Sequence, residues 1–282
     1  MNFTFYTQFT DALFQFGHSG AAEYAKKLGY SSVELFSPGG PGYPDILPDH
    51  ATAHTLHETL KKQEVPVACY TVPTDLWHNP NAEKLLMYKA ELASELECPY
   101  LHHTLFMSYN IKEGDPSYEE ARDRILESAA KVADHAKKHG VTCIYENQGG
   151  YFNSVEGFKG FFEPLKARCS NVGVCADLGN ILFVGEEPQD FLKEFAADVK
   201  HVHIKDYRRV VSETAPSPFW HPGKNNEWMQ DCMVGDGVID FAACIKLLKE
   251  AGYNGGYGLE LVHPEPFEDG VVKAMELLKG LE

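Results

Sequence analysis

The sequence contains little arginine and no long apolar segment. Only five of its 282 residues are arginine, and the formal net charge is −16 at pH 7. Because proteins bind nucleic acids largely by neutralising phosphates with lysine and arginine, we expect no nucleic-acid partner. No run approaches the roughly 18 apolar residues that a membrane helix needs, so we expect no membrane contact.

Signals for secretion and for disulfide bonding are missing as well. The first residues, Met1 to Tyr6, lack the basic start and apolar core of a signal peptide, so a cytoplasmic location is expected. The seven cysteines form neither a C-x-x-C pair nor a regular framework. We therefore assign no disulfide and expect the cysteines to be small buried side chains.

Two nucleotide-binding motifs are also absent. No G-x-G-x-x-G follows the first predicted strand, and no G-x-x-x-x-G-K-[ST] occurs anywhere. Strand and helix patterns instead alternate eight times without a break in composition, in a chain close to the usual barrel length of about 250 residues. The sequence therefore predicts a single α/β domain over residues 1–282 with the architecture of a (β/α)8 TIM barrel.

The predicted elements follow from apolar periodicity and from glycine or proline at their ends. Strands are expected over 2–9, 32–36, 65–72, 100–105, 141–145, 172–176, 199–204 and 256–261. Helices are expected over 21–28, 49–63, 81–96, 118–138, 155–166, 188–197, 241–250 and 267–278. A long insertion between predicted strands seven and eight, rich in proline and tryptophan, is interpreted as a loop.

Polar residues that can bind a metal stand at the ends of the last four predicted strands. They are Glu146, Asp177, His203 and Glu260. Because barrel strands end at one mouth, these side chains should converge there. Three carboxylates and an imidazole would repel one another unless a cation offset them. Oxygen ligands with one nitrogen favour Mn²⁺, Mg²⁺ or Co²⁺, so we expect a divalent metal site.

Several of these stretches resemble the xylose isomerase-like sugar isomerase and epimerase superfamily. The segments that carry the resemblance are Tyr145-Glu146-Asn147, Ala176 to Asn180, His201 to Asp206, Gly235 to Phe241 and Gly252 to Glu260. The resemblance covers the chain in order and implies a metal site of Glu146, Asp177, His203 and Glu260, with Mn²⁺ expected first and Co²⁺ or Mg²⁺ as alternatives. In the ketose 3-epimerase branch, the residues matching Glu146 and Glu260 also transfer the proton.

This assignment predicts an enzyme that moves a proton next to a carbonyl. Removing that proton leaves an enediolate, whose charge a metal can stabilise, and carboxylates on opposite faces of the substrate can take and return the proton. We therefore expect a metal-dependent isomerase or epimerase with Glu146 and Glu260 as the acid/base pair. Its partner would be a small sugar or polyol-type molecule.

Residues near the four predicted ligands are candidates for substrate binding. By the family analogy, Arg209 would hold substrate oxygens, with Arg208 as an equally placed rival. Asn147 could bind hydroxyls, and Trp220 could form part of an aromatic lid. His102 and His103 end predicted strand four, where alternation sends only one of them inward. We name His103 as the candidate and interpret Lys205 as structural.

Two departures from the epimerase branch keep other functions open. The chain has Asn180 where that branch has a substrate-binding histidine, and Phe152 where it has a second glutamate. Asn180 could still bind a hydroxyl. The alternative is a lyase on the same scaffold, such as an inosose dehydratase or the barrel subunit of a C-glycoside deglycosidase, and a third possibility is a non-catalytic sugar-binding subunit. Barrels of this kind often form homo-oligomers, although no segment indicates an interface.

Overall fold

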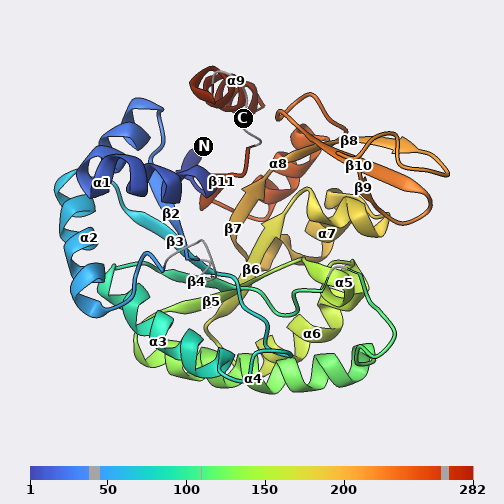
Figure 1. Ribbon diagram of the computed structural model, residues 1–282, viewed down its shortest axis with the longest axis horizontal. Helices are drawn as coiled ribbons and strands as arrows, with labels where there is room; N and C mark the ends of the chain where they lie inside the picture. Colours follow the sequence, from blue (N-terminus) through green and yellow to red (C-terminus); the bar gives the residue numbers. More distant parts are fainter. Residues whose placement is uncertain (38–44, 109, 262–266, 282) are drawn as a thin grey trace.

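Eight parallel strands form a closed barrel in the computed structural model, which describes residues 1–37, 45–108, 110–261 and 267–281. Around the barrel the strands lie in the order β1-β11-β7-β6-β5-β4-β3-β2 (Figure 1). They are β1 (Asn2–Phe5), β2 (Ser32–Phe36), β3 (Val67–Val72), β4 (Tyr100–His103), β5 (Thr142–Glu146), β6 (Val172–Asp177), β7 (Val199–Ile204) and β11 (Gly256–Leu259). The predicted (β/α)8 TIM barrel is confirmed.

Helices surround the strands, each lying after a strand in the chain (Figure 1). They are α1 (Thr7–Lys27), α2 (His50–Lys62), α3 (Ala82–Glu95), α4 (Tyr118–Lys138), α5 (Gly149–Phe152), α6 (Val155–Arg168), α7 (Pro188–Phe195), α8 (Phe241–Glu250) and α9 (Phe267–Lys279), with 3₁₀ turns η1 (Asn180–Val184) and η2 (Ala196–Asp198). None of them, within the described ranges, has the length and apolar character to cross a bilayer.

Local sequence signals explain why most of the helix bounds agree with the predictions. Ser117 and Glu120 form a reciprocal capping box at the start of α4, and Asp49 caps α2 through the amide of Thr52. Such caps stabilise a helix by about 1 kcal/mol each. The buried residues of α4 recur every three or four positions, so one face of the helix packs on the barrel.

The first predicted strand was wrong beyond Phe5. The structure begins α1 at Thr7, so the second half of the expected strand is helical. Phe9, Ala12 and Leu13 are buried on one helical face. The apolar residues at the start of the chain had instead suggested a strand that continues to residue 9. Gly17 interrupts the helix with a φ of 66°, a value that glycine adopts without steric cost. The burial of Phe9, Ala12 and Leu13, which the local pattern does not reveal, determines that this segment is helical.

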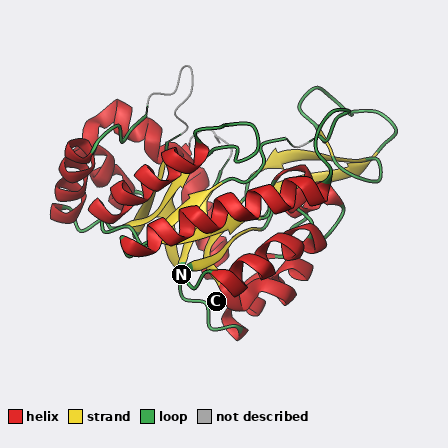
Figure 2. Ribbon diagram, turned by 90° about the horizontal axis from the view of Figure 1, so that it is seen from below, coloured by secondary structure: helices red, strands yellow, loops and turns green. Residues whose placement is uncertain are grey.

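The insertion predicted as a loop contains a small antiparallel sheet. Its strands are β8 (Asp206–Val211), β9 (His221–Pro222) and β10 (Glu227–Cys232), in the order β8-β10-β9. Figure 2 shows this sheet extending from one side of the barrel. The buried Asp206 carboxylate accepts hydrogen bonds from the amides of Gly235, Gly237 and Ile239 at 2.9, 3.0 and 3.3 Å. It thereby joins the end of the insertion to its beginning.

Candidate active site

Three of the four predicted metal ligands meet at the carboxyl ends of the barrel strands. Glu146 is the last residue of β5, Asp177 the last of β6, and His203 is opposite Asp177 in the register of β7. Each of the three offers one ligand atom, and these atoms lie within 4.8 Å of one another. All three side chains are buried. The arrangement concentrates two carboxylates and an imidazole in a site sheltered from water.

Glu146 is surrounded by nitrogen atoms. Its Oε1 lies 3.3 Å from His203 Nδ1 and accepts a hydrogen bond of 3.1 Å from the Asn180 amide, while its Oε2 lies 3.3 Å from His102 Nε2. Burial by itself raises the pKa of Glu146, but the hydrogen bonds and charge attraction of His102 and His203 outweigh it and hold this pKa well below its ordinary value. Glu146 is therefore held as a carboxylate.

Lys205 connects Asp177 to the fourth predicted ligand. Its Nζ lies 3.0 Å from Asp177 Oδ2 and donates a hydrogen bond of 3.1 Å to Glu260 Oε2. Glu260 directly follows β11, and its side chain is 32% exposed, whereas that of Glu146 is 4% exposed. Lys205 directly follows β7 and points to the same side as His203, two residues earlier. Its interpretation as structural stays a prediction.

The two carboxylate oxygens of Asp177 have different surroundings. Its Oδ1 accepts hydrogen bonds from the amides of Gly179 and Asn180 at 2.8 and 2.7 Å, but its Oδ2 accepts none. Burial raises the pKa of Asp177 to about 7, and the nearby charges of Glu146 and Glu260 add to this against the attraction of Lys205. A cation beside Oδ2 would favour the charged form.

A second polar network lies behind these residues and comes from the first half of the barrel. Glu34 on β2 lies 2.7 Å from His201 Nε2 and 3.1 Å from His203 Nε2, and it accepts a hydrogen bond from Thr71. Thr71 also lies 3.0 Å from His102 Nδ1. Burial raises the pKa of Glu34, but His203 and His201 lower it by more, so that it lies well below its ordinary value.

Sequence reasoning missed Glu34 and His201. The signal was present, because a carboxylate in the middle of the apolar strand Val33-Glu34-Leu35 needs a buried partner. The network also explains Gly258. A Cβ at that position would lie 3.1 Å from atoms of Glu34, His201 and His203, so a larger residue on the neighbouring strand would crowd the network.

A cavity of about 540 Å³ opens beside the cluster. Its walls come from the turn after β5, from η1, from the site itself and from the small sheet. The lining residues are Asn110, Gln148, Gly149, Gly150, Asn153, Asn180, Phe183, Val184, Lys205, Tyr207, His221, Pro222, Gly223, Lys224, Asp231 and Glu260. Its size suits a small molecule, and amides, charges and an aromatic ring face the space.

The predicted substrate-binding residues close to the cluster have different surroundings. Asn180 lines the cavity and binds Glu146. Asn147 is fully buried and exchanges two hydrogen bonds with the backbone of Asp177, at 2.9 and 3.0 Å, so its amide holds the ends of β5 and β6 together. This placement favours a positioning role for Asn147 over contact with substrate.

Strand alternation selects His102 in place of the predicted His103. His102 points toward Glu146. His103 packs its ring against Tyr145 at 5.0 Å and lies 3.1 Å from the carbonyl of Thr104. Tyr145 in turn packs on Phe161 of α6, so His103 faces the helix layer. The prediction for His103 is therefore corrected to His102, since adjacent strand residues face opposite sides.

The two remaining candidates lie on the insertion and are not among the described residues that line the cavity. Arg209 on β8 forms an ion pair of 2.7 Å with Glu187. Trp220 is half-buried in the segment before β9, next to His221, which does line the cavity. The roles of Arg209 and Trp220 in substrate binding stay predictions. His221 is the aromatic residue of this segment that reaches the space.

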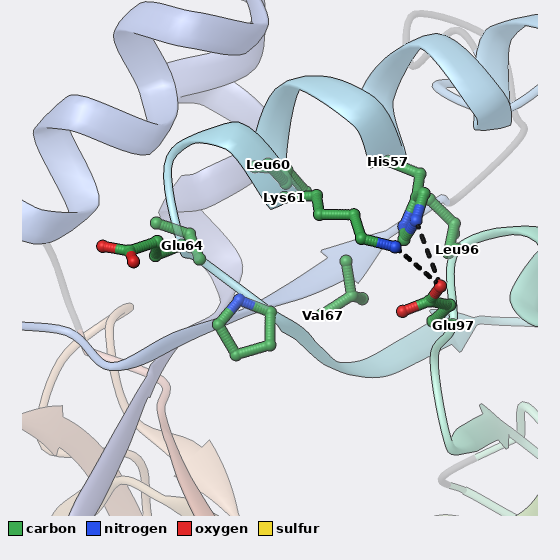
Figure 3. Close-up of a pocket in the computed structure, with 9 residues that line it drawn as sticks. His57, Leu60, Lys61, Glu64, Val67, Leu96 and Glu97 are labelled. Carbon is green, nitrogen blue, oxygen red and sulfur yellow. Dashed lines mark hydrogen bonds and ion pairs between the residues drawn. The ribbon is translucent and has the colours of Figure 1, made fainter.

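The opposite end of the barrel has a smaller pocket of about 260 Å³ (Figure 3). It lies where α2 ends and β3 begins, and its wall includes Leu60, Val67 and Leu96. Three of the polar side chains there contact one another, because Glu97 lies 2.9 Å from Lys61 and 3.6 Å from His57. This pocket lacks the group of closely spaced, uncompensated ligand atoms that marks the barrel mouth.

A family model described as xylose isomerase-like TIM barrel matches residues 22–281. The chain belongs to the xylose isomerase-like TIM barrel family. The resemblance drawn from the sequence is therefore confirmed. Among the curated proteins, an inosose dehydratase 1 of Bacillus cereus is 35% identical over 149 residues, which are 50% of this chain and 47% of that protein. The chain thus spans about half the length of such curated relatives.

Solved structures with this barrel include an epimerase and a magnesium complex. The apo crystal structure of 3-keto-D-glucoside 4-epimerase from E. coli has a TM-score of 0.75 at 14% identity, covering 99% of each chain. A xylose isomerase-like TIM barrel protein from Mycobacterium smegmatis, in complex with magnesium, has a TM-score of 0.71 at 15% identity, covering 93% of this chain and 87% of that chain. These likenesses establish a shared fold.

Proposed function

We propose that this xylose isomerase-like barrel is a divalent-metal-dependent isomerase or epimerase of a small sugar or sugar derivative. The observation that carries the proposal is the convergence of Glu146, Asp177 and His203 within 4.8 Å beside a cavity of about 540 Å³. Glu260 is connected to this cluster through Lys205, whose ammonium lies 3.1 Å from Glu260 and 3.0 Å from Asp177. Glu260 lines the cavity, and Asn180 and Lys205 in its wall contact Glu146 and Asp177, which supports a site at the inner end of this space.

The donor set fits a divalent metal. Carboxylate oxygens with one imidazole nitrogen suit Mn²⁺, Mg²⁺ or Co²⁺, and Mn²⁺ is the metal that we propose first. The Asp177 Oδ2 atom is buried without a hydrogen bond and faces the Lys205 ammonium at 3.0 Å. A bound ion would share this oxygen with that ammonium. Glu146, Asp177 and His203 would hold the ion, with Glu260 as the fourth ligand.

In this proposal, Glu146 and Glu260 would act on opposite sides of a substrate. When bound, the metal would polarise the carbonyl and offset the negative charge that develops when the neighbouring proton leaves. Glu146, kept as a carboxylate by His102 and His203, would remove or return that proton. Glu260, oriented by its hydrogen bond from Lys205, would do the same from the more exposed side.

Other residues of the cavity would position the sugar. The amides of Gln148, Asn153 and Asn180 face the cavity among its lining groups, and amide side chains can both donate to and accept from hydroxyls. His221 and the backbone after it close the outer side. A polyhydroxylated substrate would replace the water in this space with several specific hydrogen bonds.

A lyase is the second candidate function, and the similarity to inosose dehydratase 1 favours it. The first step would be the same proton removal, and the charge would then expel a group from the β position instead of returning to carbon. This alternative needs an acid for the leaving group. Lys205, which lines the cavity and contacts Glu260, is a cationic group that could supply this proton.

A substrate screen with product masses tests both functions. The purified protein would be incubated with Mn²⁺ and with ketoses, 3-keto sugars and inososes, and products followed by mass spectrometry and NMR in deuterated water. An isomer that gains solvent deuterium at carbon supports the isomerase or epimerase. Loss of water or of an aglycone supports the lyase. Metal binding without turnover of any of these would contradict both and leave the non-catalytic sugar-binding subunit.

A further inference from the structure

A groove of about 500 Å³ on the outside of the barrel, between α2, α3 and α4, gathers histidines and glutamates. Its lining residues are His50, His54, His57, Glu58, Lys61, Glu91, Ser94, Glu95, Glu97 and His139. It therefore holds four of the thirteen histidines of the chain. None of these residues belongs to the candidate active site, so the groove is a separate feature.

Three consecutive helices each present two of these side chains one turn apart. The pairs are His50 and His54 on α2, Glu91 and Glu95 on α3, and His135 in the last turn of α4 with His139 directly after that helix. His135 lies next to the lining residues and contacts Glu91. Residues four apart lie on the same helical face. Because α3 packs between α2 and α4, its two carboxylates lie between imidazoles from both sides.

On the side of the groove formed by α3 and the end of α4, three ligand atoms come together. Glu91, His135 and His139 each offer one such atom, and the three atoms lie within 4.8 Å of one another. Glu91 Oε1 lies 3.0 Å from His135 Nε2, and the rings of His135 and His139 are 4.9 Å apart. On the other side, His50 Nε2 lies 3.8 Å from Glu91 Oε2. All three helices thus reach the same carboxylate.

At the other end of the groove, formed by the end of α2 and by Glu97, the carboxylate has a lysine partner, as Figure 3 shows. There the side chains of Lys61 and His57 both point at Glu97, and the lysine ammonium lies 2.9 Å from the carboxylate. A cationic side chain therefore already neutralises Glu97. Within the described residues, the ion pairs of Glu91 are with His50 and His135 instead. Both of these partners are imidazoles, which can bind a metal ion together with a carboxylate.

We propose that Glu91, His135 and His139 form a zinc site, with His50 as the fourth ligand. Two or three imidazoles and one carboxylate are a donor set that Zn²⁺ takes in tetrahedral geometry, with bonds of about 2.0–2.2 Å. Rotation of these side chains, of which His50 is exposed and the other three are half-buried, would bring the donor atoms onto one ion. The ion would tie α2, α3 and α4 together outside the barrel. The proposal is independent of the function of the barrel mouth.

Zinc titration of the metal-free full-length protein tests this. Isothermal titration calorimetry and elemental analysis would compare the wild type with the double variant His135→Gln/His139→Gln and with His18→Gln, a histidine of α1 outside the groove. We expect the double variant to bind about one zinc ion fewer per chain, because both α4 ligands are lost. The His18→Gln variant should bind as the wild type does.

The difference between variants is informative whatever happens at the barrel mouth. If the mouth also takes zinc, the wild type binds one ion more than the double variant; if it does not, the double variant binds none. Should the double variant fail to fold, Glu91→Gln, which keeps the side-chain shape, should lose the same ion. Equal zinc counts and affinities in the wild type and these variants would overturn the proposal, and so would wild-type binding only at millimolar zinc.

Discussion

The two halves of the barrel contribute to the mouth in different ways. The strands β5, β6 and β7 carry Glu146, Asp177 and His203, whose ligand atoms lie close together, and Glu260, which follows β11, lines the cavity. The strands β2, β3 and β4 carry Glu34, Thr71 and His102, which lie behind them. The second half therefore carries the proposed ligand groups, and Glu34 and His102 of the first half contact His203 and Glu146 and fix their positions.

Hydrogen bonding separates the two groups further. The carboxylate of Glu34 is matched by two histidines and a threonine, so little capacity is left for a ligand. Asp177 has one buried oxygen without a hydrogen bond. A buried acid that is fully matched stabilises the fold, whereas one that is incompletely matched costs stability and is expected where a ligand binds.

The largest effect is expected from removing the proposed proton-transfer groups. Glu146→Gln and Glu260→Gln should each lower kcat by about 10²–10⁴-fold, since a neutral amide cannot take the proton. The rate would be measured on the substrate found in the screen, and Glu276→Gln on the exposed face of α9 serves as the control. A wild-type kcat in either variant would remove that residue from the reaction.

Metal removal should act on the second half of the barrel alone. After EDTA treatment and dialysis, turnover should be lost while the circular dichroism spectrum is kept, because the first-half network needs no ion. Added Mn²⁺ or Co²⁺ should restore the rate. Full turnover in a sample shown by elemental analysis to be metal-free would contradict the proposed site.

Glu34→Gln should affect stability, as a test of the first half. Removing one partner of a buried charged group costs about 3–5 kcal/mol, and an amide would place a donor against His201 or His203. The pKa of Glu34 lies below its ordinary value of 4.5 in the fold, so its stabilisation is present above about pH 4.5 and is lost as the pH falls. Urea unfolding at several pH values measures this.

The variant should therefore lose less stability than the wild type between neutral and acid pH. Glu276→Gln again provides the reference, since it changes the same group on an exposed surface. Parallel pH curves for Glu34→Gln and the wild type would show that the Glu34 charge contributes no stability.

Substitutions of two asparagines near Asp177 should have smaller effects and separate a structural role from substrate binding. Asn147→Ala removes two buried hydrogen bonds to the backbone of Asp177 and should cost about 1–3 kcal/mol of unfolding free energy. Asn180→Ala, on the cavity wall, should change KM by more than it changes stability. Thermal unfolding and steady-state kinetics measure both. If Asn147→Ala changed mainly KM and Asn180→Ala changed mainly stability, Asn147 would be the substrate-binding residue and Asn180 the structural one.

The smallest effect is expected from the insertion. Shortening the exposed segment 213–220 between β8 and β9 should change the relative KM values of different sugars, because the next residue, His221, lines the cavity. The unfolding free energy should change by less than about 0.5 kcal/mol, as for surface changes generally. A lower melting temperature with uniform loss for all substrates would count against a role in substrate choice.

Much of this architecture could be read from local patterns. The bounds of α4 and α8 agree with prediction to the residue, because caps and helical periodicity are local properties. The convergence of Glu146, Asp177 and His203 could also be anticipated, since the ends of parallel strands meet at one mouth whatever their separation in the chain. Their chemical roles remain part of the proposal.

Register and packing were beyond the reach of such patterns. Which of His102 and His103 faces inward depends on the phase of β4 in the sheet, and a shift of one residue exchanges them. The inward position of Lys205 and the antiparallel pairing of β8 with β10 depend on contacts between distant segments. So does the role of Glu34, whose partners lie 167 and 169 residues away along the chain.

The sequence by itself determined the alternation of strands and helices and the order of the polar residues that end the strands, because both follow from side-chain type and local spacing. Only the tertiary structure decided which polar groups are matched and which are left with unused capacity. That distinction depends on distances between atoms brought together by barrel closure, and closure is a property of all eight strands at once.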